Sequence, residues 1–201
     1  GDWVIREACR TAATWPEHLT IAVNLSAPQF DKDRIVDVVT SSLAETGLLP
    51  GRLELEITES LLIERPDDVL ATLMRLKELG VSIAMDDFGT GYSSLSYLLK
   101  FPFDKIKIDK SFISAIDHDK AACDVLRTIG SLGKTLGIRI TAEGVETEEQ
   151  VTFLRAIACD QLQGYFFAKP LDSSGVATFL LGNAAQRLKT AETNTPSSKA
   201  A

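Results

Sequence analysis

The chain has 201 residues, 45% of them hydrophobic, which is enough apolar sequence to bury the core of one domain. Its net charge of -7 excludes the diffuse attraction by which basic proteins hold DNA or RNA polymers. No apolar run approaches the roughly 18 residues of a membrane span, and no basic, apolar leader opens the chain. We therefore expect a cytoplasmic segment without membrane contact, although an upstream region could anchor the parent protein.

Strand and helix patterns alternate along the chain, with apolar residues recurring at period two or at helical spacing. In chain order we expect a helix over residues 1–15, a strand over 19–25, a helix over 28–43, a strand over 52–58, a helix over 66–79, a strand over 81–85, a short helix over 92–99, a strand over 104–109, a helix over 120–136, a strand over 138–142, a helix over 148–157, a strand over 161–167 and a helix from 173 or 174 to 181. Gly137 is expected to end one helix and Thr147 to cap the next. Residues 1–182 form the predicted domain, and the polar stretch over 183–201 is the predicted flexible tail.

Strand-to-helix alternation of this kind predicts parallel strands covered by helices, and both a barrel and an open doubly wound sheet satisfy it. An open sheet gathers its ligand groups near one switch point, whereas in a barrel the end of every strand faces one mouth. Because polar residues follow strand after strand, we expect a TIM-like (β/α)8 barrel. A complete barrel needs about 250 residues, so this one is expected to be incomplete at its N-terminus.

The central stretch is Val81–Gly91, where an apolar strand meets Asp86 and Asp87 and a glycine-rich loop follows. Two adjacent ionised carboxylates at a strand end need compensating cations or hydrogen-bond donors, and a divalent metal is the simplest of these. The alternative is that the two aspartates only begin a turn.

Other strand ends repeat this polar pattern, at Asn24, Glu56 with Glu59, Lys107 with Asp109, Glu143 with Glu146, and Gln163. Carboxylate and amide oxygens are the ligands of Mg²⁺ or Mn²⁺, and two such ions activate water in phosphodiester hydrolysis. Zinc is disfavoured, because neither histidine follows a strand and the three cysteines lack a Cys-x-x-Cys spacing.

Simpler interpretations remain for several of these residues. Lys107 and Asp109 could form only an ion pair with each other. Glu54 could pair with Arg139 inside the barrel or lie near its floor, and Ser93 could be a helix cap.

Six segments, VNLS, ELEITES, MDDFGTGYSSL, KIKIDKSF, TAEGVET and QGYFFAKP, together resemble the EAL-domain family of cyclic di-GMP phosphodiesterases. The resemblance covers about residues 1–181. It implies a barrel fold and Mg²⁺- or Mn²⁺-dependent hydrolysis of cyclic di-GMP (c-di-GMP) to linear pGpG in bacterial second-messenger signalling.

The resemblance also assigns roles residue by residue. The metal ligands that it implies are Asn24, Glu56 and Asp86 for one ion, and Asp86, Asp87 and Glu143 for the other. Lys107 resembles the lysine that positions the catalytic water, and Gln163 the glutamine near that water or the substrate. The residues that it implies in the substrate-binding region and its loop are Glu59, Ser93, Asp109 and Glu146.

The Glu-Ala-Leu tripeptide that names the family does not occur in these 201 residues. The segment alone is therefore expected to have an unclosed barrel and to be inactive, with the activity belonging to the complete domain. The alternatives are a catalytically inactive c-di-GMP receptor and a regulatory dimerisation module. The expected partners are a second copy in a homodimer and an upstream sensor or GGDEF module.

Overall fold

The structure is a computed structural model that describes residues 1–30, 34–64, 66–89 and 95–180. The chain forms two compact units, residues 1–167 and residues 168–201. The described part of the second unit contains a helix over residues 173–180. The predicted tail over residues 183–201 lies outside the described residues. Among the described residues, no helix has both the length and the hydropathy needed to span a bilayer.

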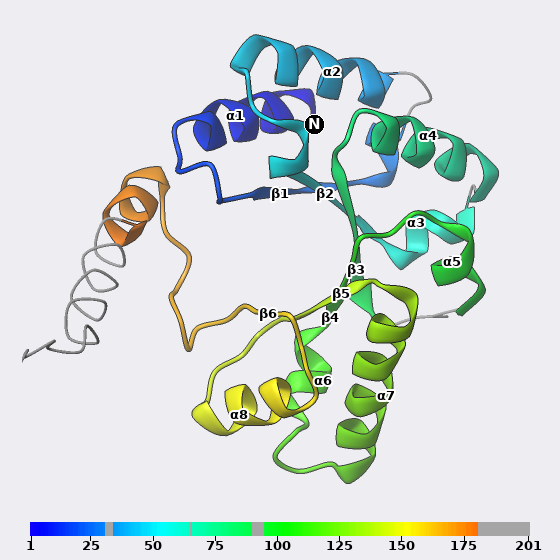
Figure 1. Ribbon diagram of the computed structural model, residues 1–201, viewed down its shortest axis with the longest axis vertical. Coiled ribbons are helices and arrows are strands. Elements are labelled where there is room, and N and C mark those ends of the chain that lie inside the picture. Colours follow the sequence, from blue (N-terminus) through cyan, green and yellow to red (C-terminus); the bar gives the residue numbers. More distant parts are fainter. Residues whose placement is uncertain (31–33, 65, 90–94, 181–201) are drawn as a thin grey trace, which may run out of the picture. The chain divides into compact units, whose positions relative to one another are not determined.

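Six parallel strands form one sheet in the first unit, and their order in the sheet is their order in the chain. The strands follow an arc, as the wall of a barrel does (Figure 1). An open doubly wound sheet would reverse its strand order at a switch point, so this half-barrel confirms the predicted incomplete barrel. The strands are β1 Ile21–Leu25, β2 Leu53–Thr58, β3 Ser82–Phe88, β4 Lys105–Ile108, β5 Arg139–Ala142 and β6 Gln161–Leu162.

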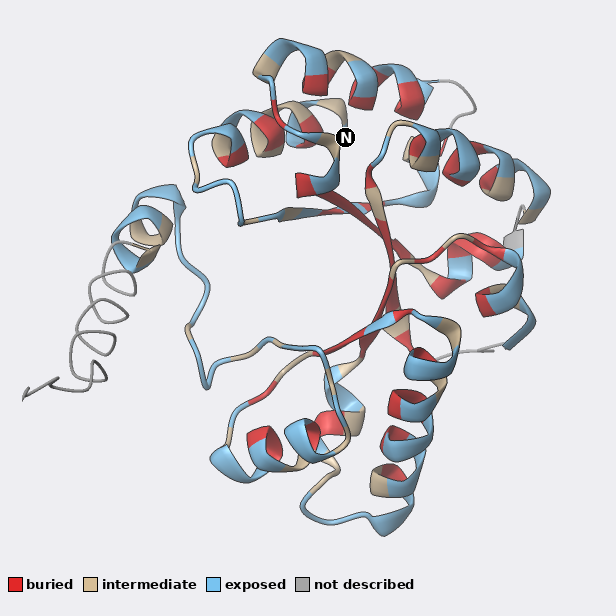
Figure 2. Ribbon diagram, in the orientation of Figure 1, coloured by how far each residue is buried: buried red, intermediate tan, exposed pale blue. Residues whose placement is uncertain are grey.

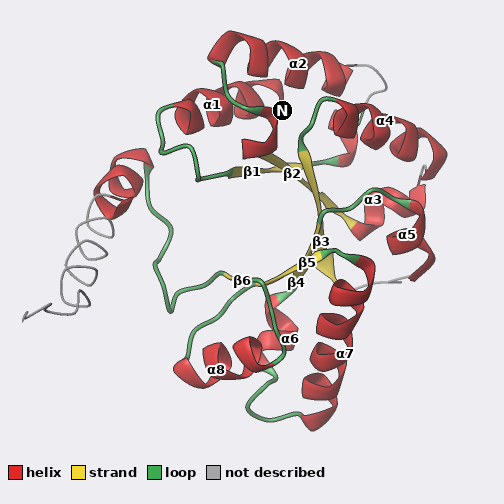
Figure 3. Ribbon diagram, in the orientation of Figure 1, coloured by secondary structure: helices red, strands yellow, loops and turns green. Residues whose placement is uncertain are grey.

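The helices of the first unit lie on the outer side of the arc (Figure 3). The longer ones each turn one apolar side inward; in α7, for example, Leu126 and Ile129 are buried while Arg127 and Thr128 are exposed. The α-helices of the first unit are α1 Asp2–Ala13, α2 Arg34–Thr46, α3 Glu59–Glu64, α4 Pro66–Glu78, α5 Leu95–Lys100, α6 Lys110–Ser114, α7 Lys120–Leu136 and α8 Glu148–Ala156, with 3-10 turns η1 Ala27–Gln29 and η2 Pro50–Arg52.

The strands are largely buried (Figure 2), and their two faces differ in chemistry. In β2 the apolar residues Leu53, Leu55 and Ile57 are fully buried. Glu54 and Glu56 alternate with them on the other face and are each 5% exposed. Because lysines from β4 reach these glutamates, the inner face of the half-barrel is a charged but paired surface.

Arg52 joins the beginning of the sheet to the loop after α1. Its guanidinium donates hydrogen bonds to four backbone carbonyl oxygens, those of Ala12 and Leu19 at 2.7 Å, Pro16 at 3.2 Å and Trp15 at 3.3 Å. The residue is only 8% exposed. One buried side chain thus ties together the end of α1 and the loop that follows it; the Ala12 and Pro16 carbonyls also accept from the Trp15 and Leu19 N–H groups at 3.0 Å.

Two strand ends differ from the sequence prediction. β3 does not stop before the aspartates but continues to Phe88, with a register shift between Met85 and Phe88 and a positive φ of 55° at Asp87. Such a bulge re-aims side chains without ending the strand. β6 ends at Leu162 instead of residue 167, because the chain then turns and the Phe167 N–H donates to the Gly164 carbonyl oxygen at 3.1 Å. The helices α3 and α6 were not predicted.

Candidate active site

The side chain of Lys107 lies at the centre of the polar cluster. Its Nζ is 2.6 Å from Glu56 Oε2, 2.7 Å from Glu143 Oε1 and 3.0 Å from Asp86 Oδ1. These residues come from β2, β3, β4 and the segment directly after β5. Parallel strands bring their carboxyl ends to the same rim, so residues far apart in the chain meet at one point.

Burial and charge act in opposite directions in this cluster. Burial disfavours the Lys107 ammonium, but its hydrogen bonds to Glu143 and Glu56 outweigh that effect and raise the pKa of Lys107. Burial raises the pKa of the Glu56 carboxyl, and the hydrogen bond from Lys107 offsets only part of this. Burial, and then the negative charges of Asp86 and Asp109, raise the pKa of Asp87. Three carboxyl groups thus share the single ammonium of Lys107, and the site favours a further positive charge.

Asp86 is only 8% exposed. Its Oδ1 has no hydrogen-bond donor in the structure, although Lys107 Nζ lies 3.0 Å away. The contact with Lys107 is thus an ion contact whose geometry is poor for a hydrogen bond. A buried carboxylate oxygen without a donor is costly unless a cation binds it, which fits the predicted role of Asp86 as a metal ligand.

A pocket of about 420 Å³ adjoins the cluster, and Glu143 belongs to both. It collects five of the predicted site residues, namely Asp87, Asp109, Glu143, Glu146 and Gln163. Asp109 is also the N-cap of α6, where its Oδ1 accepts from the Ser111 N–H at 3.0 Å. The hydrogen bond to Ser111 lowers the pKa of Asp109. Carboxylates and an amide thus line a cavity of ligand size.

The remaining predicted residues lie around this centre. Asn24 is exposed on β1, in register with Glu56 on β2. Glu59 is 5% exposed at the first turn of α3. Neither Asn24 nor Glu59 lines the 420 Å³ pocket. Ser93 lies outside the described residues.

Comparison with known proteins identifies the family. The sequence profile of the EAL domain matches residues 1–170. The chain belongs to the EAL domain family. A relative is the "bifunctional diguanylate cyclase/cyclic di-GMP phosphodiesterase MucR" of Pseudomonas aeruginosa, which is 44% identical over 85% of this chain and 26% of its own length. The resemblance inferred from the six sequence segments is therefore confirmed at the level of the family.

Solved EAL structures agree with this assignment. The MucR phosphodiesterase in complex with c-di-GMP superposes with a TM-score of 0.83 at 43% identity, covering 88% of this chain and 73% of that one. A manganese and c-di-GMP complex of Klebsiella pneumoniae BlrP1 gives a TM-score of 0.77 at 31% identity, over 84% of this chain and 45% of that one. This EAL chain spans only about a quarter of the length of the relatives it matches.

Two simpler interpretations of the sequence were wrong. In the EAL structure Lys107 pairs with Glu56, Asp86 and Glu143, while Asp109 caps a helix. Glu54 pairs with Lys105, at 2.7 Å between Oε1 and Nζ, and not with Arg139. The lysines of β4 and the glutamates of β2 share the inner face of the half-barrel, which accounts for both pairings.

Sequence reasoning also missed three residues that line the pocket, Lys110, Gly144 and Tyr165. Gly144 has a φ of 69°, and a Cβ there would lie 2.5 Å from the Cβ of Lys110. Only glycine combines this backbone conformation with such a close approach. A glycine directly after a strand-end glutamate was the available signal for this wall of the pocket.

The described residues of the EAL domain contain no group of three or more His, Cys, Asp and Glu side chains arranged to hold a metal. The donors nevertheless have suitable chemistry, since Mg²⁺ and Mn²⁺ prefer oxygen ligands. The unsatisfied Asp86 Oδ1 supports the same fit. The ammonium of Lys107 lies in the middle of the cluster, within 3.0 Å of an oxygen of Glu56, Asp86 and Glu143.

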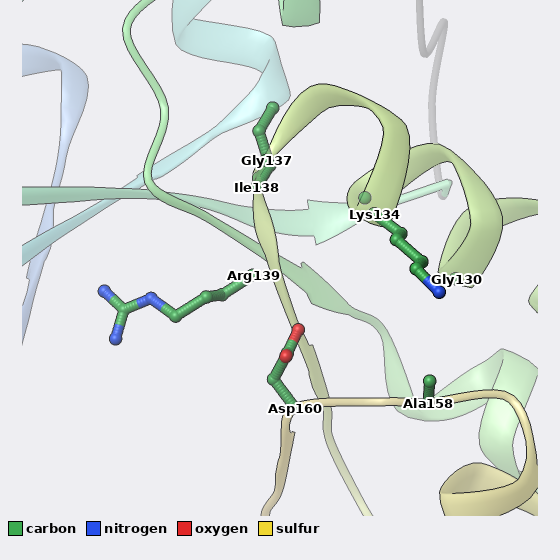
Figure 4. A pocket seen from close by; sticks show the side chains of 8 residues that line it. Gly130, Lys134, Gly137, Ile138, Arg139, Ala158 and Asp160 are labelled. Atoms are coloured by element: carbon green, nitrogen blue, oxygen red, sulfur yellow. The ribbon is translucent and has the colours of Figure 1, made fainter.

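A second pocket, of about 340 Å³, lies between α7, β5 and the loop before β6. Figure 4 shows that Lys134 and Arg139 point in different directions and do not converge on one ligand position. Asp160 already accepts a hydrogen bond from the Ile140 N–H at 2.7 Å. This pocket collects none of the predicted site residues, and we assign it no role.

Proposed function

We propose that the full-length protein is a phosphodiesterase that hydrolyses c-di-GMP to linear pGpG with Mg²⁺ or Mn²⁺. The observation that carries the proposal is the convergence of Glu56, Asp86 and Glu143 on one point beside a pocket of about 420 Å³. The relative MucR bears the name of a c-di-GMP phosphodiesterase, and its solved structure is a complex with that ligand.

In this proposal Glu56, Asp86, Asp87 and Glu143, together with Asn24, supply oxygen ligands for the divalent cations. When bound, such cations lower the pKa of a coordinated water and stabilise the charge that develops on the phosphodiester. The carboxylates of these proposed ligands come from strand ends, and the sheet keeps their oxygen atoms in place.

The other site residues act on the substrate and the water. Lys107 orients the attacking water or offsets phosphate charge, because its ammonium lies within 3.0 Å of three ligand carboxylates. Glu143 also serves as a proton acceptor, since it lies both at Lys107 and on the pocket wall. Gln163, Asp109 and Glu146 line the same pocket and position the nucleotide.

The test is to incubate the full-length protein with c-di-GMP and Mg²⁺ or Mn²⁺ and to measure pGpG by chromatography. We expect product from the parent protein and at least about a hundredfold less from Asp86→Asn. Asp124→Asn is the matched control, because Asp124 is an exposed carboxylate on α7 that pairs only with neighbouring Arg127 among the contacts described. It should leave the rate unchanged.

The two alternatives give different results. Tight c-di-GMP binding without pGpG in either metal would identify a receptor. Absence of both binding and product would reject every c-di-GMP function and leave a regulatory module.

A further inference from the structure

Lys107 contacts the same carboxylates that we propose as metal ligands. We propose that its ammonium is an internal counter-ion, which holds these carboxylates together in the metal-free protein and competes with the divalent cation for them. This inference rests on the metal site of the proposed function. It assigns Lys107 a role before substrate or water is bound.

The contacts carry the first step of the argument. Glu56 and Asp86 lie on two different strands and Glu143 directly follows a third, yet each places an oxygen within 3.0 Å of one Nζ atom. The side chain of Lys107 is 7% exposed and that of Glu56 is 6% exposed, so solvent screens their charges little. Without a cation between them, three carboxylates at this distance would repel one another and spread the strand ends.

The charge balance gives the second step. Three carboxylates and one ammonium leave a net charge of -2 (-3 + 1) at this point. One layer below, on β2 and β4, Lys105 pairs with Glu54, its one ion-pair partner among the described residues, and this pair has no net charge. The cluster around Lys107 thus has the excess negative charge that a divalent cation would neutralise, whereas the Lys105–Glu54 pair has none.

Competition is the third step. A divalent cation bound by Glu56 and Asp86 takes oxygen atoms that Lys107 contacts, and it also repels the ammonium. Glu143 is 20% exposed, lies 2.7 Å from Lys107 and lines the pocket. A first cation held by Glu56 and Asp86 would therefore leave Glu143, on the pocket wall, as the remaining carboxylate contact of Lys107 until a second cation binds.

The experiment measures Mn²⁺ binding directly, from the electron paramagnetic resonance signal of free Mn²⁺, with the full-length protein and its variants. Mn²⁺ binding that is lost in Asp86→Asn is assigned to this site. We expect Lys107→Met and Lys107→Gln to lower the Kd for this Mn²⁺ by about tenfold or more, because a competing charge is gone. Lys107→Gln keeps a hydrogen-bond donor and serves as the second variant if Lys107→Met does not fold without metal.

Lys134→Met is the control for a general charge effect, since Lys134 is an exposed lysine of the second pocket, to which we assign no role. Its Kd should stay within about twofold of the parent value. The second readout is the melting temperature. Without metal, both Lys107→Met and Lys105→Met should melt lower than the parent, but Mn²⁺ should raise the melting temperature of Lys107→Met by more than it raises that of the parent or of Lys105→Met.

The outcomes separate this inference from the proposed function. Equal Kd values for the parent and both Lys107 variants would overturn the counter-ion role, even if the parent makes pGpG. An equal decrease of the Kd in Lys134→Met would overturn it as well. A lower Kd in the Lys107 variants of a protein that makes no pGpG would support the inference and reject the hydrolysis. Absence of Mn²⁺ binding in every variant would reject the metal site and the inference together.

Discussion

The buried ion pair beneath the site allows a quantitative prediction. Lys105 and Glu54 are 2.7 Å apart, and their side chains are 8% and 6% exposed. Lys105→Met leaves the Glu54 carboxylate with the hydroxyl of Ser82, 3.5 Å from its Oε2, as the remaining described contact. Removal of one partner from a buried pair costs about 3–5 kcal/mol of unfolding free energy.

The expected loss of unfolding free energy in Lys105→Met is therefore about 3–5 kcal/mol. The double variant Glu54→Leu with Lys105→Met should recover most of the loss, because no unpaired charge remains.

The assay is urea-induced unfolding in metal-free buffer, followed by circular dichroism. Lys77→Met is the matched control, because Lys77 and Asp104 are 2.6 Å apart but 31% and 30% exposed. Water can replace the missing ammonium there, and we expect a loss of at most about 1 kcal/mol. A loss below about 1 kcal/mol in Lys105→Met, or a double variant as unstable as the single one, would refute the reasoning.

Three further predictions concern the pocket wall, a thiol and the loop after α1. Gly144→Ala should lower both the melting temperature and pGpG formation, because the new Cβ would lie 2.5 Å from the Cβ of Lys110. Gly137→Ala is the control, since Gly137 has the same φ of 69° but no atom within 4 Å of a Cβ built there. It should lose only the unfolding free energy of the unfavourable backbone conformation, about 1 kcal/mol. Burial raises the pKa of the Cys159 thiol to about 11. The alkylation rate of Cys159, followed by mass spectrometry, should therefore rise near pH 11. The unfolding free energy should decrease between about pH 9 and pH 11, because the thiol ionises there in the unfolded chain but not in the folded one. An inflection near pH 8.5 would contradict this. Arg52→Met should lower the unfolding free energy by about 3 kcal/mol in urea, because the Leu19 and Trp15 carbonyl oxygens lose their described donor, whereas those of Ala12 and Pro16 keep only a backbone N–H. No change in the urea midpoint would show that water replaces the guanidinium.

Local sequence patterns predicted the elements well where a single element decides its own structure. The alternation of Leu53, Leu55 and Ile57 with glutamates predicted both the strand and its two faces, because side chains alternate along any strand. Gly137 ends α7 in the left-handed conformation, and Thr147 caps α8 with a capping box, as predicted. These features depend only on residues close in sequence.

Local patterns failed where partners are distant or the backbone is irregular. The partner of Lys107 on β2 is 51 residues away in the chain, as is the partner of Lys105. The bulge at Asp86 and Asp87 kept β3 in the sheet where the sequence suggested that the strand ended. The alternation of apolar and polar residues along one strand does not predict its register with neighbouring strands. That register decides which charged side chains lie opposite each other.

The sequence by itself determined the family, the order of the strands and of the helices other than α3 and α6, and the set of polar residues at the strand ends. Only the tertiary structure decided that three of their carboxylates share one ammonium and that Lys110, Gly144 and Tyr165 complete the pocket. The physical reason is that residue type and periodicity are local properties of the chain. The distances between side chains depend instead on how six parallel strands align across the half-barrel.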